Sequence, residues 1–303
     1  MANIKELKNR IVSVRNTRKI TNAMYLISSA KLRKAKEELA KTRPYFECTE
    51  HEIKRIFQST TETKSHYFYP PTGRKPAETY AYLVITADKG LAGAYNHNVI
   101  KRAEAEMRKH KKVRLYVIGE YGRRYFKAHH GPVEETFFYT AQDPTFRRAR
   151  EISIRLLEEY NSGRVDEIRV IYSDMENEMT STVKRVRVLP FERKAFLSEE
   201  EQAHCSDQMY KFEPSPSVVL DQMIPSYVAG FIYGAMVDSF SAEQNARMTA
   251  MSSANKNAEE LLGELQIEYN RVRQSAITQE ITEVASGARA QKKKKKKTSA
   301  QDT

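Results

Sequence analysis

Apolar residues recur at the spacing of a coiled-coil helix along the first part of the chain. They follow one another at intervals of three and four residues, as the seam of a coiled coil requires. The seam begins with Ile4, Leu7, Ile11 and Val14, and continues in smaller or more polar residues through Arg18, Thr21, Tyr25, Ser28, Leu32, Ala35 and Leu39. Neither proline nor glycine occurs before Pro44. We therefore predict one helix of roughly 60 Å that ends before Pro44.

A second stripe lies beside this seam where the seam turns polar. It consists of Ile20, Ala23, Met24 and Ile27. We expect this stripe to take over the packing there. A core helix of a globular bundle would show a similar stripe. The length of the pattern favours an extended coiled coil over residues 1–43.

The last part of the chain carries a matching heptad pattern. It contains no proline after Pro225. The seam runs through Val237, Ser241, Gln244, Met248, Met251, Asn255, Ala258, Leu262, Leu265, Tyr269, Val272 and Ala276. It then shifts by one residue to Ile277, Ile281 and Val284, which changes the winding locally. We predict a second coiled-coil helix over residues 225–290, antiparallel to the first.

Charge favours the pairing of these two helices. The segment Met1–Arg43 holds twelve Lys/Arg and three Asp/Glu, whereas Ser226–Ala290 holds five Lys/Arg and eight Asp/Glu. Opposite charges attract, although each exposed pair contributes only about 0.2–0.5 kcal/mol. The positive charges left over on the first helix form either a solvated face or a surface for an acidic partner.

The middle of the chain, residues 44–224, alternates strand-like and helix-like segments. Strands are expected at Thr79–Ala87, Val113–Ile118, Glu167–Ser173 and Val183–Leu189; helices are expected at Tyr95–His110, Tyr121–His129 and from the Asp143-Pro144 N-terminus to Tyr160. This alternation predicts a Rossmann-like α/β domain with a mainly parallel sheet. The fold class is therefore α/β, with a long antiparallel coiled coil of the two terminal helices.

Composition narrows the function classes. The 303 residues include no tryptophan, and no apolar run approaches the length of a transmembrane helix or a signal peptide. Much of the net charge of +12 comes from the run Lys292–Lys297. We expect residues 291–303 to form a disordered, solvated tail. Cys48 and Cys205 lie far apart in sequence, which suits a reducing compartment.

The sequence offers no recognisable active site. No phosphate-binding loop of the GxxxxGK[ST] type occurs, and the two glycines in Asp88–Gly93 after the first strand form a turn rather than a dinucleotide fingerprint. The seven histidines have no metal-ligand spacing. We expect no catalytic residues, no cofactor and no bound metal.

Four segments together resemble the gamma subunit of the bacterial F-type ATP synthase. They are Ile20–Glu47, ITADKGLAGAYNHNV (Ile85–Val99), SFSAEQNARMTAMSSANKNAEELL (Ser239–Leu262) and YNRVRQSAITQEITEVASGA (Tyr269–Ala288). With the α/β middle, this resemblance covers nearly the whole chain. It implies a central rotor shaft that couples ion-driven rotation of a membrane ring to ATP synthesis or hydrolysis.

The resemblance also implies the partners. One copy would stand inside a hexamer of α and β subunits, with the epsilon subunit and the ring of c subunits at the α/β domain. Catalysis would belong to the β subunits. The chain would be peripheral, at the cytoplasmic face of the cell membrane, and associated with the membrane only indirectly. No nucleic acid is implied, and the choice between H⁺ and Na⁺ belongs to other subunits.

Residues that match the family motifs inherit an expected role as rotor–stator contacts. They are Met24, Lys89, Gly90, Leu91, Ala92, Arg247, Arg273, Gln274 and Thr278. Met24 would face the β lever, and Lys89–Ala92 would form the turn that approaches β. The chain departs from the family at Arg289–Thr303, because members commonly stop near the SGA segment. Two other classes stay open: a stand-alone coiled-coil adaptor, and a nucleic-acid-binding protein that uses the lysine run.

Overall fold

The computed structural model describes residues 4–59, 65–68, 77–129, 133, 135–137, 141–175, 180–192, 196 and 211–298, without the side chains of residues 290–298. The chain divides into two compact units. We call Leu26–Ala250 the globular unit. We call Met1–Tyr25 together with Met251–Thr303 the helix-pair unit.

A five-stranded sheet organises the globular unit. Its spatial order is β3-β2-β1-β4-β5. The strands are β1 (Thr79–Ile85), β2 (Lys112–Ile118), β3 (Glu135–Thr136), β4 (Glu167–Met175) and β5 (Ser181–Leu189). All neighbours are parallel except β4 and β5, which are antiparallel. The predicted α/β fold with a mainly parallel sheet is therefore confirmed. The short strand β3 was not predicted.

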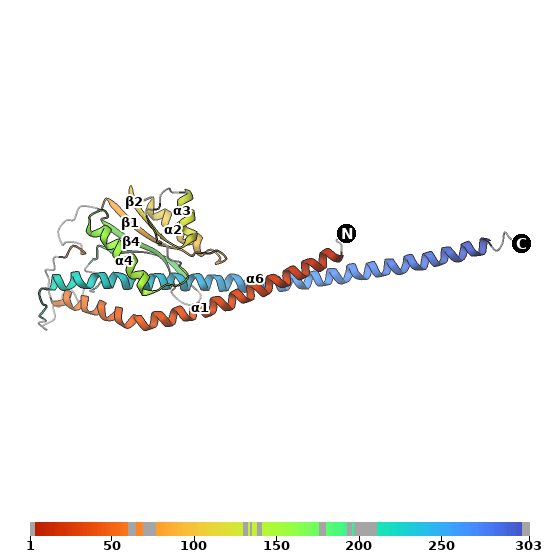
Figure 1. The fold of residues 1–303 in the computed structure, drawn as a ribbon, viewed down its shortest axis with the longest axis horizontal. Helices are drawn as coiled ribbons and strands as arrows, with labels where there is room; N and C mark the ends of the chain where they lie inside the picture. The colour runs from red at the N-terminus through yellow and green to blue at the C-terminus, as the bar shows by residue number, and fades with distance from the viewer. Residues whose placement is uncertain are drawn as a thin grey trace. The chain divides into compact units, whose positions relative to one another are not determined.

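Helices cover both faces of this sheet (Figure 1). They are α2 (Tyr95–Met107), α3 (Glu120–His129) and α4 (Phe146–Asn161), together with parts of the two terminal helices. Alternate residues of β1 face opposite sides, as a strand requires. Tyr82 and Val84 pack with α2 and α3, whereas Leu83 and Ile85 join the larger core with α4 and the terminal helices.

The terminal helices are longer than predicted. Helix α1 spans Ile4–Ser59 and contains Pro44, which we expected to end it. Helix α6 spans Pro216–Thr298 and contains Pro225, which we expected to precede it. A proline inside a helix costs about 3 kcal/mol because it removes a hydrogen bond and crowds the preceding turn. Burial of the apolar residues on either side offsets this cost.

The helix-pair unit contains segments of the same two helices, and here they are antiparallel. Arg18 forms an ion pair with Glu259 at 3.5 Å, and the Thr21 hydroxyl donates to the Asn255 side chain. Residue numbers therefore rise along α1 as they fall along α6. Leu7 and Ile11 pack against Leu265, which confirms this part of the predicted seams. The predicted seam residues Ala276, Ile277, Ile281 and Val284 are exposed.

Other details of the sequence prediction need correction. Ile20 and Ile27 are exposed, so the second stripe does not take over the packing. Helix α4 is capped by Thr145, whose side chain accepts a hydrogen bond from the Arg148 N–H, and not by Asp143. Helix α6 continues to Thr298, beyond the expected end at Ala290, so the backbone of the lysine run is helical.

Candidate functional site

The turn after β1 gathers four of the predicted contact residues. The buried chain leaves β1 through Ala87, reverses over Asp88–Gly93 and enters α2 at Tyr95. Leu91 has a φ of 63° and is 66% exposed. A side chain in this left-handed conformation costs roughly 1–2 kcal/mol. The turn therefore presents a large apolar side chain to solvent in a conformation that its surroundings must maintain.

Hydrogen bonds hold the base of this turn. The Asn96 side chain accepts from the Ala87 N–H at 2.9 Å and donates to the Lys89 carbonyl at 3.4 Å. One oxygen of the Asp88 carboxylate accepts from the Glu120 N–H at 3.0 Å, which fastens the turn to the start of α3. Both side chains use the capacity of Asn and Asp to bond nearby backbone groups.

Helix α6 lies under the same turn. Ala92 is only 2% exposed and packs with Ala242 and Ala246 of α6. Arg247, also on α6, donates from Nη2 to the Gly90 carbonyl at 3.1 Å. The structure thus brings Arg247, Gly90 and Ala92 together, with Ala92 facing inward and Leu91 facing outward.

Arg247 is a buried residue. It is 8% exposed and forms an ion pair with Glu243 at 2.6 Å. Burial raises the pKa of the Glu243 carboxyl, and the charge of Arg247 offsets only part of this effect. The polar contacts of Arg247 in this structure are therefore made inside the chain.

The remaining predicted contacts lie in the helix-pair unit. Met24 is half-buried, whereas Arg273, Gln274 and Thr278 are exposed. The Thr278 hydroxyl donates to the Gln274 carbonyl within α6 at 2.9 Å. Every described side chain from Arg273 to Arg289 is exposed. This stretch of α6 is therefore uncovered on all of its faces.

A basic groove in the helix-pair unit was not assigned to residues by sequence reasoning. Its volume is about 570 Å³. Its lining includes four cations and one acid: Arg15, Arg18, Lys19, Lys256 and Glu259. The excess of Lys and Arg on the first helix was the signal that pointed to it. Such a groove suits a negatively charged partner.

Comparison with known proteins identifies the family. The family profile described as ATP synthase matches residues 3–291. A protein of Caldanaerobacter subterraneus subsp. tengcongensis, described as an ATP synthase gamma chain, is 44% identical over 94% of this chain and 98% of its own. The chain belongs to the ATP synthase gamma-chain family. It is a central-stalk rotor subunit of an F-type ATP synthase, an enzyme whose catalytic sites lie in the beta subunits.

Another relative supports this gamma-family assignment, and a solved structure shares the fold. A sodium-ion-specific ATP synthase gamma chain of Acetobacterium woodii is 35% identical over 95% of this chain and 98% of its own. A chain of the Euglena gracilis mitochondrial ATP synthase shares the fold with a TM-score of 0.66 and 14% identity, over 95% of this chain and 94% of that one. The gamma-subunit prediction is confirmed over the adaptor and nucleic-acid alternatives.

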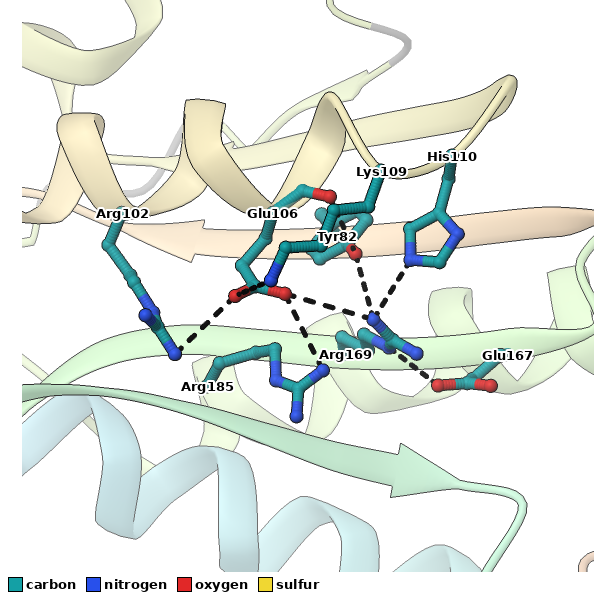
Figure 2. A network of polar contacts seen from close by, with 8 residues as sticks. All are labelled: Tyr82, Arg102, Glu106, Lys109, His110, Glu167, Arg169 and Arg185. Carbon is teal, nitrogen blue, oxygen red and sulfur yellow. Dashed lines mark hydrogen bonds and ion pairs between the residues drawn. The ribbon is translucent and has the colours of Figure 1, made fainter.

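The globular unit of this gamma-family chain contains a charged network centred on Glu106 of α2 (Figure 2). Glu106 is buried and contacts four cations: Lys109 at 2.8 Å, Arg102 at 3.4 Å, Arg185 at 3.5 Å and Arg169 at 4.0 Å. Burial opposes ionisation of Glu106, but the cations, Lys109 and Arg185 foremost, hold its pKa below the usual value. The ionised carboxylate joins α2 to β4 and β5.

Arg169 extends this network across the sheet. It forms an ion pair with Glu167 at 2.5 Å, donates to the Tyr82 hydroxyl at 3.1 Å and lies 3.0 Å from Nε2 of His110 (Figure 2). Burial and the neighbouring Arg169 charge lower the pKa of His110, so its ring is neutral and Nε2 can accept from Arg169. Every charged group here has a partner, which is the arrangement of a structural network rather than of a reacting site.

Metal sites and membrane spans are both missing from the described part of the gamma-family chain. Among those residues, no group of three or more His, Cys, Asp or Glu side chains is placed to hold a metal ion. None of the helices within the described ranges is long and apolar enough to cross a membrane.

Proposed function

We propose that this chain rotates as a single copy inside a hexamer of α and β subunits, driven by a membrane ring of c subunits and accompanied by an epsilon subunit. Its rotation would force the three β sites into different conformations and so couple ion flow to ATP synthesis or hydrolysis. The complex would place the chain at the cytoplasmic face of the cell membrane, as a peripheral protein.

The uncovered end of α6 carries this proposal. Ile277, Ile281 and Val284 are all exposed there, beside the polar residues Arg273 and Gln274. Apolar side chains left in water at this density indicate a surface that another chain covers. Ile277, Ile281 and Val284 follow one another at intervals of four and three residues, so they lie on one face of the helix, and Arg273, four residues before Ile277, shares that face. A subunit of the hexamer would cover this face.

We also propose which residues of this chain contact the β subunits. Arg273, Gln274 and Thr278 would make polar contacts with loops of the β subunits, and Met24 and the turn at Leu91 would meet β at its lever. These residues are the family-motif positions that are at least partly accessible in this structure. The basic groove around Arg18 would face the negative charge of the β lever.

Ion pumping driven by ATP tests the proposal. In the assembled complex, Arg273→Ala and Gln274→Ala should lower the number of coupling ions, H⁺ or Na⁺, pumped per ATP hydrolysed. Far-UV circular dichroism of the isolated chain should stay unchanged, because both side chains are exposed. Arg271→Ala is the matched control for Arg273→Ala, since Arg271 lies two positions away and points about 200° around the helix. Normal pumping by both variants would refute the β contacts proposed for Arg273 and Gln274, whereas a complex that forms and couples without this chain would refute the proposed function.

A further inference from the structure

Leu91 is held in a conformation that its own chemistry disfavours. A glycine would occupy the left-handed region without cost, as Gly93 does nearby at a φ of 54°. Leucine instead carries a local penalty and exposes its side chain to water. Such strain persists only where surrounding contacts over-determine the backbone, and it is often found where a side chain must be presented to a ligand or partner.

Arg247 supplies the contact at the tip of this turn. Its guanidinium reaches the carbonyl of Gly90, the residue directly before Leu91, at 3.1 Å. Asn96 and Asp88 hold the base of the turn, at Ala87, Lys89 and Glu120. The Arg247 contact therefore acts at the point in the turn where Leu91 is presented.

Glu243 keeps this guanidinium in place. It lies one helical turn before Arg247 on α6, and its side chain is 2% exposed. A planar guanidinium can bond a carboxylate and a carbonyl at the same time, whereas a lysine ammonium acts as a point charge. Removing Arg247 would also leave the Glu243 carboxylate buried without its counter-ion, which is costly.

We infer that Arg247 is a positioning residue, which fastens the Gly90 carbonyl to α6 so that Leu91 projects as a rigid apolar tip toward the facing β subunit. The inference rests on the proposed function and changes the role expected of Arg247. Arg247 acts through the turn and does not itself contact the partner. Leu91 makes the contact, through the shape and apolar character of its side chain.

The first experiment measures the mobility of the turn Asp88–Gly93 in the isolated full chain. Cys48 and Cys205 are replaced by serine, and a nitroxide label is attached at Lys89→Cys, an exposed position. Arg247→Ala should make the label markedly more mobile in its electron paramagnetic resonance spectrum. Arg247→Lys should do the same while the thermal midpoint stays close to that of the parent, because lysine still neutralises Glu243.

Gly90→Ala is the matched control for this measurement. No heavy atom lies within 4 Å of the Cβ that it would add, and the carbonyl is retained. The label should therefore stay as immobile as in the parent. A label that remains immobile in Arg247→Lys, or that becomes equally mobile in Gly90→Ala, would overturn the positioning role.

The second experiment measures how the side chain at position 91 affects ion pumping by the assembled complex. Leu91→Asn keeps a residue that tolerates the left-handed region but makes the tip polar, whereas Leu91→Met keeps it apolar. Leu91→Asn and Arg247→Lys should each lower the number of coupling ions pumped per ATP hydrolysed several-fold, and Leu91→Met should leave that ratio close to the parent value. Equal ratios for Leu91→Asn and Leu91→Met would overturn the apolar tip. Failure of the parent chain to join the complex would instead refute the proposed function. The mobility of the spin label in the isolated chain would still test the role of Arg247.

Discussion

Apolar residues of α6 are buried in the globular unit but exposed near the end of the helix in the helix-pair unit. In the globular unit, Leu220, Ile224, Val228 and Ile232 of α6 are completely or almost completely buried against the core. In the helix-pair unit, Ile281 and Val284 of the same helix are 64% and 70% exposed. The apolar pattern alone does not distinguish these segments, so an apolar residue on a long helix can belong either to the chain's own core or to a surface covered by a partner.

Truncating a large side chain in each unit should produce the largest contrast. Ile232→Ala should lower the free energy of unfolding by about 2–5 kcal/mol, because it removes buried methylene groups and leaves a cavity. Ile281→Ala should change it by less than about 0.5 kcal/mol, because that side chain is exposed. Urea denaturation of the isolated chain measures both. A similar loss in the two variants would show that Ile281 is buried in the free chain.

Replacing a glycine by alanine should change the stability of the chain in opposite directions in the two units. A Cβ at Gly230 would lie 2.2 Å from the ring of Phe46, and that ring is itself packed against Phe146 and Tyr233. Gly230→Ala should therefore destabilise the chain by about 1–3 kcal/mol. At Gly263 of the helix-pair unit nothing lies within 4 Å, so Gly263→Ala should stabilise the helix by about 0.5–1 kcal/mol. Thermal unfolding followed at 222 nm would detect both; a stabilising Gly230→Ala would contradict the close packing.

Acid titration should distinguish the units next. Burial, and then the neighbouring Asp174 carboxylate, raise the pKa of Asp238 from its usual 3.8 to about 6. The folded state therefore retains a proton that the unfolded state releases, and stability should fall as pH rises from about 4 to about 6. Asp238→Asn should flatten this slope and be more stable at pH 7 by on the order of 1 kcal/mol, after allowance for solvent screening.

The control for this titration is Glu264→Gln, at an exposed position of the helix-pair unit. Because this side chain is exposed, its substitution should change the free energy of unfolding at pH 7 by less than about 0.5 kcal/mol. The charged groups facing Asp238 include Lys184, which contacts Asp174 from β5. A stability profile of Asp238→Asn that runs parallel to the parent profile would contradict the raised pKa.

Removing the lysine run should have the smallest effect. All of the proposed contacts lie before Ala290, and six adjacent like charges resist burial. Truncation after Ala290 should leave assembly and ATP hydrolysis within about twofold of the full chain, which corresponds to less than about 0.5 kcal/mol of barrier. A tenfold loss of hydrolysis would show that the run makes a specific contact. Effects that vanish at high salt would mark it as a nonspecific electrostatic guide.

Sequence reasoning located the helices and strands because their periodic patterns are local. It failed at Pro44 and Pro225, where a local rule competes with burial. Each proline costs about 3 kcal/mol, but fully burying each large apolar side chain gains about 1.5–3 kcal/mol. Helix α1 continues past Pro44 into residues such as Ile53 and Ile56, which are buried in the larger core. Only the folded core shows that this burial exceeds the cost.

At the candidate site, too, the sequence revealed the local pattern but not the contacts between distant residues. The family motif selected Leu91, Ala92 and Arg247, but it could not tell which of them faces outward. Ala92 is small enough to pack against the alanines of α6, and Arg247 has a carboxylate one turn away on its own helix. The spacing of Glu243 and Arg247 was visible in the sequence as an i,i+4 pair. Its burial, and its reach to Gly90, depend on contacts between residues far apart in the chain.

The larger core joins α1 to α6, two helices that most of the sequence separates. Ile53 and Phe57 of α1 share that core with Leu220 and Ile232 of α6. On the ribosome, α1 emerges first and must wait for most of the chain before its apolar face is covered. Contacts between residues so distant in sequence close slowly, and uncovered apolar surface invites aggregation in the meantime. Maturation of this subunit therefore depends on completion of translation and on protection of the nascent first helix.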